Sequence, residues 1–277
     1  HEINTLRKHL SRFSGGSLVR AAFPATVLGL IVSDVVGDDL DVIASGPTVP
    51  DPSTFADCLR VVEHYGLRWK MPQSIWAHIE GGLQGRTPET PKADEPAFGR
   101  VRNVLVASVK QALEAAADEA ARCGFVPRIL TTAMSGEARR TAEQLVAEAR
   151  RAQAGLRPGD APLCLLAGGE TTVTIRGSGK GGRNQEMALA ATLELADDRG
   201  IDLICVGTDG TDGPTDAAGG YAFSGDLARL RAIGLHPKES LDANDSYPLL
   251  LKAGTLLRTG PTRTNVMDMA IMLVRPK

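Results

Sequence analysis

The segment GSGKGGRNQE, residues 177–186, constrains the fold of this chain more than any other stretch. It places four glycines, Lys180 and Arg183 between a strand-like run at residues 171–176 and a helix-like run that begins near Asn184. Glycines let the backbone turn with its N–H groups exposed, and a helix N-terminus adds a positive dipole. We therefore expect a loop for a phosphate or a carboxylate, built on Gly177, Gly179, Gly181 and Gly182.

Strand-like and helix-like runs alternate around this loop. Short apolar runs at residues 27–32, 103–107, 125–131, 163–167 and 201–206 predict buried strands. Helices are expected at residues 109–123 and after caps at Asp51 and Ser135, and alternating residues at 172–175 predict a strand with one wet face. This order predicts an α/β protein with largely parallel, helix-covered sheets.

A Gly-, Pro- and charge-rich stretch at residues 81–100 has no periodicity and indicates a linker. We expect two α/β domains, at residues 1–98 and 99–277. Helical spacing begins directly after His1 without a start signal, so we expect the first domain to be incomplete and an upstream part to exist.

Composition narrows the choice of partners and compartment. Because 31 basic residues face 33 acidic ones, nucleic acid is not an expected partner. The longest apolar run, residues 22–32, is too short and too interrupted to span a bilayer, so we expect a soluble protein. Four separated cysteines in apolar runs (Cys58, Cys123, Cys164 and Cys205) predict buried free thiols and a cytoplasmic location.

Residues 207–220, GTDGTDGPTDAAGG, form an acidic loop after the strand-like run at 201–206. Ligands of open α/β sheets bind beyond the carboxyl ends of the strands. Asp209 and Asp212 can hold Mg²⁺ together with nucleotide phosphates, although Asp-Gly pairs also make simple turns. The presence of a third carboxylate, Asp216, favours a site.

Other polar loops allow two interpretations each. SDVVGDD, with Asp34, and IASGPT are either substrate loops or turns with helix caps, and TGPTRTN is either a phosphate contact or two linked turns. The glycine-rich loop also satisfies G-x-G-x-x-G, so an NAD(P)H-dependent reductase is an alternative. The alternating strand before the loop and the absence of a nearby histidine for acid catalysis weigh against that alternative.

Six segments together resemble the glycerate kinase family, whose members pair an N-terminal kinase domain with a MOFRL C-terminal region. The matching stretches lie between residues 3 and 268 and are INTLRKHLS, SDVVGDDLDVIASGPTVPDPST, GGETTVTIRGSGKGGRNQE, GTDGTDGPTDAAGG, NDSYPLL and TGPTRTNVMD. Members of this family are also labelled hydroxypyruvate reductases. The resemblance implies a MOFRL-like segment at residues 162–275.

The resemblance also implies ATP-dependent phosphorylation of D-glycerate to 2-phosphoglycerate, with Mg²⁺ and a cleft between two α/β domains. By motif, the family's essential arginine corresponds to Arg183. We expect Arg183 and Lys180 to stabilise the transferring phosphoryl group or the glycerate carboxylate, and Asp34 to orient the substrate hydroxyl. Glu170 and Thr208 join the glycines as expected cofactor-binding residues, and a homodimer is a further expectation.

Two departures from the family pattern stand out. The lysine regarded as catalytic in the family lies upstream of His1, so a non-catalytic nucleotide- or anion-binding remnant is a third interpretation. Arg263 stands where the family usually has glycine, in TGPTRTN. An arginine there would crowd or recharge that loop.

Overall fold

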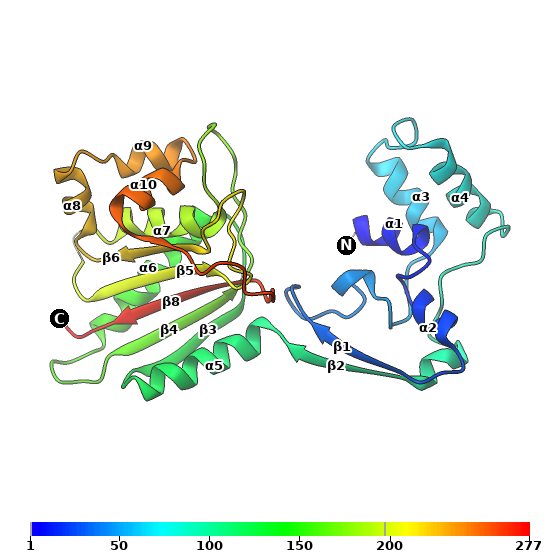
Figure 1. Cartoon of the computed structure of the whole chain (residues 1–277), viewed down its shortest axis with the longest axis horizontal. Helices are drawn as coiled ribbons and strands as arrows, with labels where there is room; N and C mark the ends of the chain where they lie inside the picture. The colour runs from blue at the N-terminus through cyan, green and yellow to red at the C-terminus, as the bar shows by residue number, and fades with distance from the viewer. Residues whose placement is uncertain (1, 197) are drawn as a thin grey trace. The chain divides into compact units, whose positions relative to one another are not determined.

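The computed structural model describes residues 2–196 and 198–277, which form two compact units (Figure 1). The first unit extends to residue 106 without residues 32–37. The second consists of Val32–Gly37 and Ala107–Lys277. The expected domain boundary at residues 98 and 99 stays a prediction.

The first unit is mainly helical. Its helices are α1 (Glu2–Leu10), α2 (Ser17–Ala22), α3 (Phe55–His64) and α4 (Gln73–Leu83), with 3₁₀ turns η1 (Ile43–Ser45) and η2 (Pro96–Arg100). Strands β1 (Val27–Val32) and β2 (Val101–Ala107) pair with each other. Phe55, Cys58, Val62 and Ile79 form a small core between α3 and α4. Helical spacing after residue 2 and the strand at 27–32 are therefore confirmed.

The second unit is built on a six-stranded sheet with the order β3-β4-β8-β5-β6-β7. The strands are β3 (Val126–Met134), β4 (Leu163–Gly169), β5 (Ile201–Gly207), β6 (Gly219–Phe223), β7 (Leu256–Leu257) and β8 (Asp268–Val274). Only β3 and β4 pair in parallel among the described strands of this sheet. The other four pairs are antiparallel.

The α/β class is confirmed, but the expected largely parallel pairing is wrong for this sheet. The reason is β8, a strand near the chain end that the sequence interpretation did not recognise. It lies between β4 and β5 and runs opposite to both (Figure 1).

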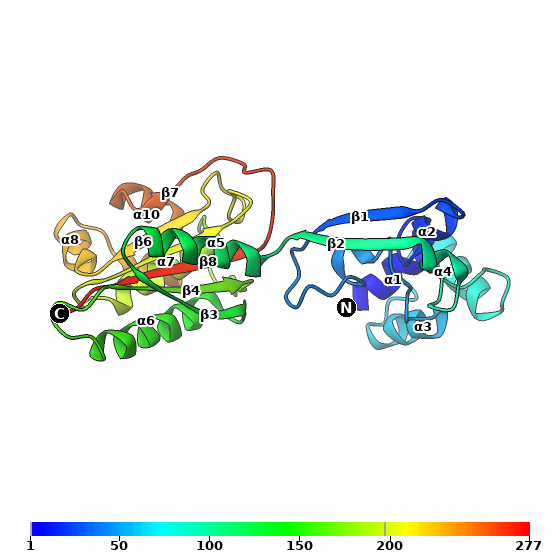
Figure 2. The ribbon, with the colours of Figure 1, turned by 90° about the horizontal axis from the view of Figure 1, so that it is seen from below.

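Helices cover both faces of this sheet (Figure 2). They are α5 (Val109–Arg122), α6 (Ala138–Ala154), α7 (Arg183–Glu194), α8 (Asp226–Ala232), α9 (Pro237–Asp242) and α10 (Ser246–Ala253). Strand residues alternate between faces, so Leu163 and Leu165 of β4 face the core formed with α6 and α7. Cys164 and Leu166 face the other core, formed with α5.

Two expected helix caps are wrong. Helix α3 begins at Phe55, because Thr54 and Asp57 form a reciprocal capping box; the carboxylate of Asp51 instead accepts from the N–H of Ser53 at 2.9 Å. Helix α6 begins after Glu137, and Ser135 does not cap it.

Two further local expectations fail. Residues 172–175 form no strand and contribute only an isolated bridge between Thr172 and Glu137. Cys123 is exposed, because it follows the last turn of α5 instead of lying within an apolar face; Cys58, Cys164 and Cys205 are buried as expected.

The sheet topology places three strand ends side by side. Gly169 at the end of β4 and Gly207 at the end of β5 both pair with Asp268 at the start of β8. Because β4 and β5 run in the same direction, the loops that follow them leave the sheet at the same edge, the one formed by the C-terminal ends of β4 and β5 and the start of β8.

Replacing Leu166 with alanine should destabilise this unit. Its side chain is fully buried between the sheet and α5, so Leu166→Ala should lower the free energy of unfolding by about 3 kcal/mol. Leu251→Ala is the control, because Leu251 is 47% exposed on α10. Denaturant titration of both variants checks this, and equal loss in the two would contradict the assigned core.

Candidate functional site at one edge of the sheet

Arg183, the first residue of α7, binds the start of β8 and the residue that follows β4. Its Nε and Nη2 donate to the two carboxylate oxygens of Asp268 at 2.5 and 3.0 Å, and its Nη1 donates to Glu170 at 2.7 Å. Burial alone would lower the pKa of Arg183, but the hydrogen bonds and charges of these carboxylates raise it above its usual value. Arg183 therefore stays charged and fixed in place.

Asp212 caps the N-terminus of α7 from the acidic loop. Its carboxylate accepts from the backbone N–H groups of Asn184 at 3.1 Å and Gln185 at 2.8 Å, and also from the Gln185 side chain at 2.9 Å. Burial raises the pKa of Asp212 to about 6, although these hydrogen bonds oppose the rise. This carboxylate joins the acidic loop to the glycine-rich segment.

The glycines of residues 177–182 are required by close packing. A Cβ on Gly182 would lie 2.5 Å from the carbonyl carbon and oxygen of Asp212, and one on Gly179 would lie 2.5 Å from the Asp245 side chain. The glycine-rich segment therefore lies against both the acidic loop and the turn before α10. Only glycine allows such close backbone contact.

Most N–H groups of the segment are already bonded within the chain, contrary to the expectation of an open cradle. The amides of Arg176 and Gly177 donate to the Asn244 side chain at 2.7 and 3.0 Å. Gly179 and Lys180 donate to the carbonyl of Ala243 and the carboxylate of Asp245. These bonds orient the segment and are not available to a ligand.

Three consecutive N–H groups remain at the start of α7. Within the described chain, the amides of Gly181, Gly182 and Arg183 donate no hydrogen bond. The first N–H groups of a helix have no intrahelical partner and attract anions. The anion-binding part of the loop is thus reduced to its last three residues.

Asn244 and Glu186 support the glycine-rich segment. The side-chain amide of Asn244 donates to Glu186 at 2.9 Å, and Glu186 also accepts from Arg139 Nε at 2.6 Å. Glu186 is 2% exposed, and Asn244 adopts a φ of 54°, in the left-handed region that asparagine tolerates. The sequence interpretation missed both residues as well as Asp268, although all three lie in or beside the segments of the resemblance.

A cavity of about 680 Å³ opens beside this arrangement in the second unit. Gly181, Gly182 and Arg183 line it together with Glu170 and Glu186, and Val36, Val173, Ile175 and Pro214 give it apolar walls. The hydroxyl of Thr171, which also lines it, is buried without a hydrogen-bond partner in the described chain. A cavity with a few polar groups and apolar walls is typical of small-molecule sites.

Lys180 does not join Arg183 at this cavity. Its ammonium lies 4.3 Å from the centre of the Tyr247 ring, a cation–π contact. The Tyr247 hydroxyl donates to Asp216 at 2.6 Å and accepts from Arg258 at 2.6 Å. Three loops are therefore joined to the start of α10 at Tyr247, and Lys180 and Arg183 contact different neighbours.

The remaining predicted site residues lie close to the C-terminal ends of β1 and β5. Thr208 donates to the carbonyl of Met267 at 2.6 Å, and Asp209 accepts from the Thr211 amide and hydroxyl at 2.9 Å each. Asp34 is exposed and lies two residues before Val36 of the cavity wall. Their catalytic, cofactor and metal roles stay predictions.

Within residues 2–196 and 198–277, no group of three or more His, Cys, Asp or Glu side chains is placed to hold a metal ion. In the same residues, no helix has the length and apolar character needed to cross a membrane.

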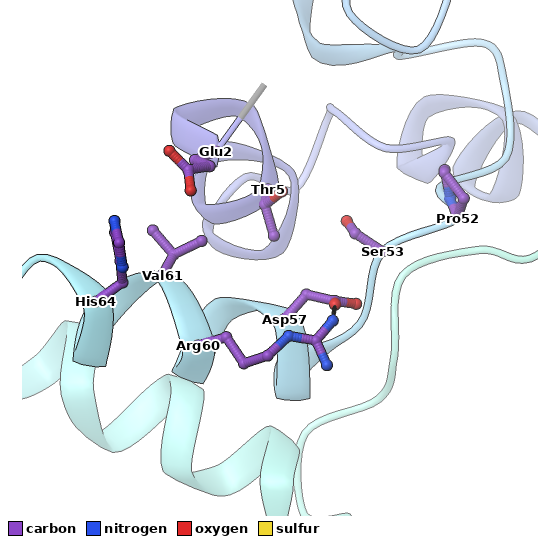
Figure 3. A pocket seen from close by; sticks show the side chains of 8 residues that line it. All are labelled: Glu2, Thr5, Pro52, Ser53, Asp57, Arg60, Val61 and His64. Atoms are coloured by element: carbon purple, nitrogen blue, oxygen red, sulfur yellow. Dashed lines mark hydrogen bonds and ion pairs between the residues drawn. The ribbon is translucent and has the colours of Figure 1, made fainter.

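A second cavity, of about 600 Å³, lies in the first unit (Figure 3). Asp57 forms an ion pair with Arg60 in this cavity (Figure 3), and Glu2 accepts from the hydroxyl of Tyr65 at 2.5 Å. None of the predicted site residues lines this cavity.

Comparisons with known proteins show the family of this chain. The MOFRL family model matches residues 163–268, and a model described as a domain of unknown function (DUF4147) matches residues 1–80. "Glycerate 2-kinase" of Pyrococcus horikoshii is 46% identical over all of this chain and 62% of the relative. A crystal structure of glycerate kinase from Thermotoga maritima is 44% identical with a TM-score of 0.87, over 99% of this chain and 63% of that one.

The chain belongs to the glycerate kinase family. It spans about 62% of the length of the Pyrococcus relative. A "Putative hydroxypyruvate reductase" of Agrobacterium vitis, 45% identical over 99% of this chain and 60% of its own length, shows that the family also carries that label. Within this glycerate kinase family member, Arg183 and the free amides at the start of α7 form the best-defined candidate site.

A side chain at residue 182 should disrupt the contact between the glycine-rich segment and the acidic loop. Because the Cβ would meet the carboxylate carbon of Asp212 as well as its backbone carbonyl, Gly182→Ala should cost about 1–3 kcal/mol of stability. Gly99→Ala is the control, since a Cβ at Gly99 meets nothing within 4 Å. Thermal melting of both variants measures the difference, and unchanged melting of Gly182→Ala would refute the close packing.

The raised pKa of Asp212 predicts a specific pH dependence. Its pKa is about 6 in the folded protein and about 3.9 in an unfolded chain, so the folded state binds more protons between these values. The contribution of Asp212 to stability is therefore greatest below about pH 4 and is lost as pH rises through about 6.

Asp212→Asn removes this titration. The free energy of unfolding of the wild type minus that of Asp212→Asn should fall by about 2 kcal/mol between pH 4 and pH 7. Denaturant titrations of the two proteins at several pH values give this difference directly. A difference that rises with pH would show that the hydrogen bonds from α7 outweigh the burial of the carboxylate.

Proposed function

We propose that this chain is part of an ATP-dependent kinase that phosphorylates the 2-hydroxyl of D-glycerate to give 2-phosphoglycerate. The observation that carries the proposal is the 46% identity to a glycerate 2-kinase along the whole chain. The cavity at the start of α7 supports it physically, because it combines free backbone donors, a fixed arginine and apolar walls. Glycerate and nucleotide phosphates are anions that such a site attracts.

Arg183 and the amides of Gly181 and Gly182 are proposed to bind the transferring phosphoryl group. Phosphoryl transfer depends mainly on positioning and charge stabilisation, which fixed donors supply without reorganisation. The bonds from Asp268 and Glu170 hold the guanidinium in one orientation. Lys180, seated on Tyr247, is proposed to support the loop and to contribute charge at longer range.

A magnesium ion, if used, would supply charge neutralisation for the phosphates. Asp209 fits this role, since its carboxylate is half-buried and, among the described residues, is bonded only to Thr211. Asp212 fits it poorly, because its buried oxygens are occupied by the start of α7. A cytoplasmic location and a homodimer stay predictions.

Direct assay separates the kinase from the reductase alternative. ADP release that requires both ATP and D-glycerate is expected, whereas NADH should not be consumed with hydroxypyruvate. The assay should include a longer protein that spans the full length of the relatives, because this chain spans 62% of the Pyrococcus relative. NADH consumption without ADP release in that longer protein would overturn the proposal.

Two variants separate the catalytic from the structural role of Arg183. Arg183→Gln should lower kcat/KM at least about 100-fold and should also lower stability by about 3 kcal/mol, since Asp268 is 1% exposed and would lose its counter-ion. The double variant Arg183→Gln with Asp268→Asn should recover stability but not activity. Recovery of activity together with stability would assign Arg183 a structural role only.

A further inference from the structure

The turn at residues 262–264 carries an arginine in a conformation that favours glycine. Arg263 has a φ of 64°, in the left-handed region. A non-glycine residue there is less stable than glycine, because its Cβ crowds the backbone. No hydrogen bond or ion pair to any described residue compensates for this, and the side chain is exposed.

Neighbouring threonines anchor this turn to the end of β5. The amide of Thr262 donates to the carbonyl of Asp209 at 3.0 Å, and its hydroxyl donates to the carbonyl of Thr208 at 2.6 Å. The amide of Thr264 donates back to the Thr262 hydroxyl at 3.4 Å. Arg263 is thus held at the tip of a short turn that sits on the first two residues after β5.

The turn lies on the same sheet edge as the candidate site. Gly207 ends β5 and pairs with Asp268, which pairs in turn with Gly169 at the end of β4. Adjacent strands are about 4.8 Å apart, so the ends of β4 and β5 are about 10 Å apart. A nucleotide polyphosphate at the start of α7 can span that distance.

The arginine at the start of α7 is already paired with carboxylates, so a further cation would strengthen the binding of such a ligand at this edge. Arg183 faces the carboxylates of Asp268 and Glu170, and Asp209 and Asp212 lie on the adjoining loop. Lys180 is engaged by Tyr247 on another side of the segment. Arg263 is a cation on this edge that is not committed to a carboxylate of the described chain.

We propose that Arg263 binds a phosphate group of the nucleotide and so sets the affinity of this chain for ATP. The inference rests on the proposed kinase function and adds a ligand-binding residue to it. A guanidinium at the tip of an anchored turn reaches a phosphate oxygen by charge-assisted hydrogen bonds. This contact forms only when the nucleotide binds, which explains why Arg263 is exposed and has a left-handed φ in the free chain.

Three substitutions at this position test the proposal. Arg263→Asn and Arg263→Gly remove the cation and suit a left-handed φ, whereas Arg263→Lys keeps the charge. Arg128→Asn is the matched control, because Arg128 is exposed near the start of β3 and its loss changes net charge equally. Isothermal titration with ATP, steady-state KM values for ATP and D-glycerate, and melting temperatures are measured for each.

Arg263→Asn and Arg263→Gly should weaken ATP binding about five- to tenfold, while Arg263→Lys and Arg128→Asn stay near the wild type. The KM for D-glycerate should not rise, and the melting temperature should not fall. Equal ATP affinity of Arg263→Asn and the wild type would overturn the inference while leaving the kinase proposal intact. A raised KM for D-glycerate with unchanged ATP affinity would also overturn it, by assigning Arg263 to the substrate carboxylate.

The titration also separates failure of the inference from failure of the proposed function. If the longer wild-type protein binds no ATP and releases no ADP, the kinase proposal and this inference are both overturned. If the wild type binds ATP and the Arg263 variants do not differ from it, only the inference fails.

Discussion

The carboxylate of Asp212 beneath the first turn of α7 is the interaction on which the candidate site depends. It satisfies the amides of Asn184 and Gln185, so the preceding amides are left at the free end of the helix. It also brings the acidic loop so close to Gly182 that no side chain fits there. Burying a carboxylate is unfavourable unless hydrogen bonds compensate, and here the N-terminus of a helix supplies them.

A second constraint is the insertion of β8 between β4 and β5. It brings Asp268 next to Gly169 and Gly207, and Arg183 of α7 binds that aspartate. Before a ligand binds, Arg183 is therefore held in place by carboxylates. The charge around it is nearly neutral, and it is not part of a cluster of free positive charge. Such an arrangement favours orientation of a ligand over strong attraction at long range.

Local patterns predicted much of the secondary structure. Helix α5 and strands β1, β2, β4 and β5 follow from runs of apolar residues, and the start of α7 from the glycines before it. The pairing order was not predictable, because β8 joins strands that are distant in sequence. Asp51 and Ser135 are good caps in isolation, but Thr54 and Glu137 precede the helices that form.

The sequence predicted several residues of the candidate site, but it did not predict the hydrogen bonds and contacts that hold the site together. Arg183 and the contact between the glycine-rich segment and the acidic loop were expected. The sequence could not reveal that the side chains of Asn244 and Asp245, more than 60 residues away, accept from the amides of Arg176, Gly177 and Lys180. It also could not show that Lys180 turns to Tyr247, because neither residue has a local signal for the other.

A crystal structure with ADP, Mg²⁺ and D-glycerate tests the central claim most directly. The account predicts an anionic group of one of these ligands within hydrogen-bond distance of the amides of Gly181, Gly182 or Arg183, with the Asp212 cap intact. Ligand bound only in the cavity of Figure 3, or a glycine-rich segment detached from the acidic loop, would contradict it.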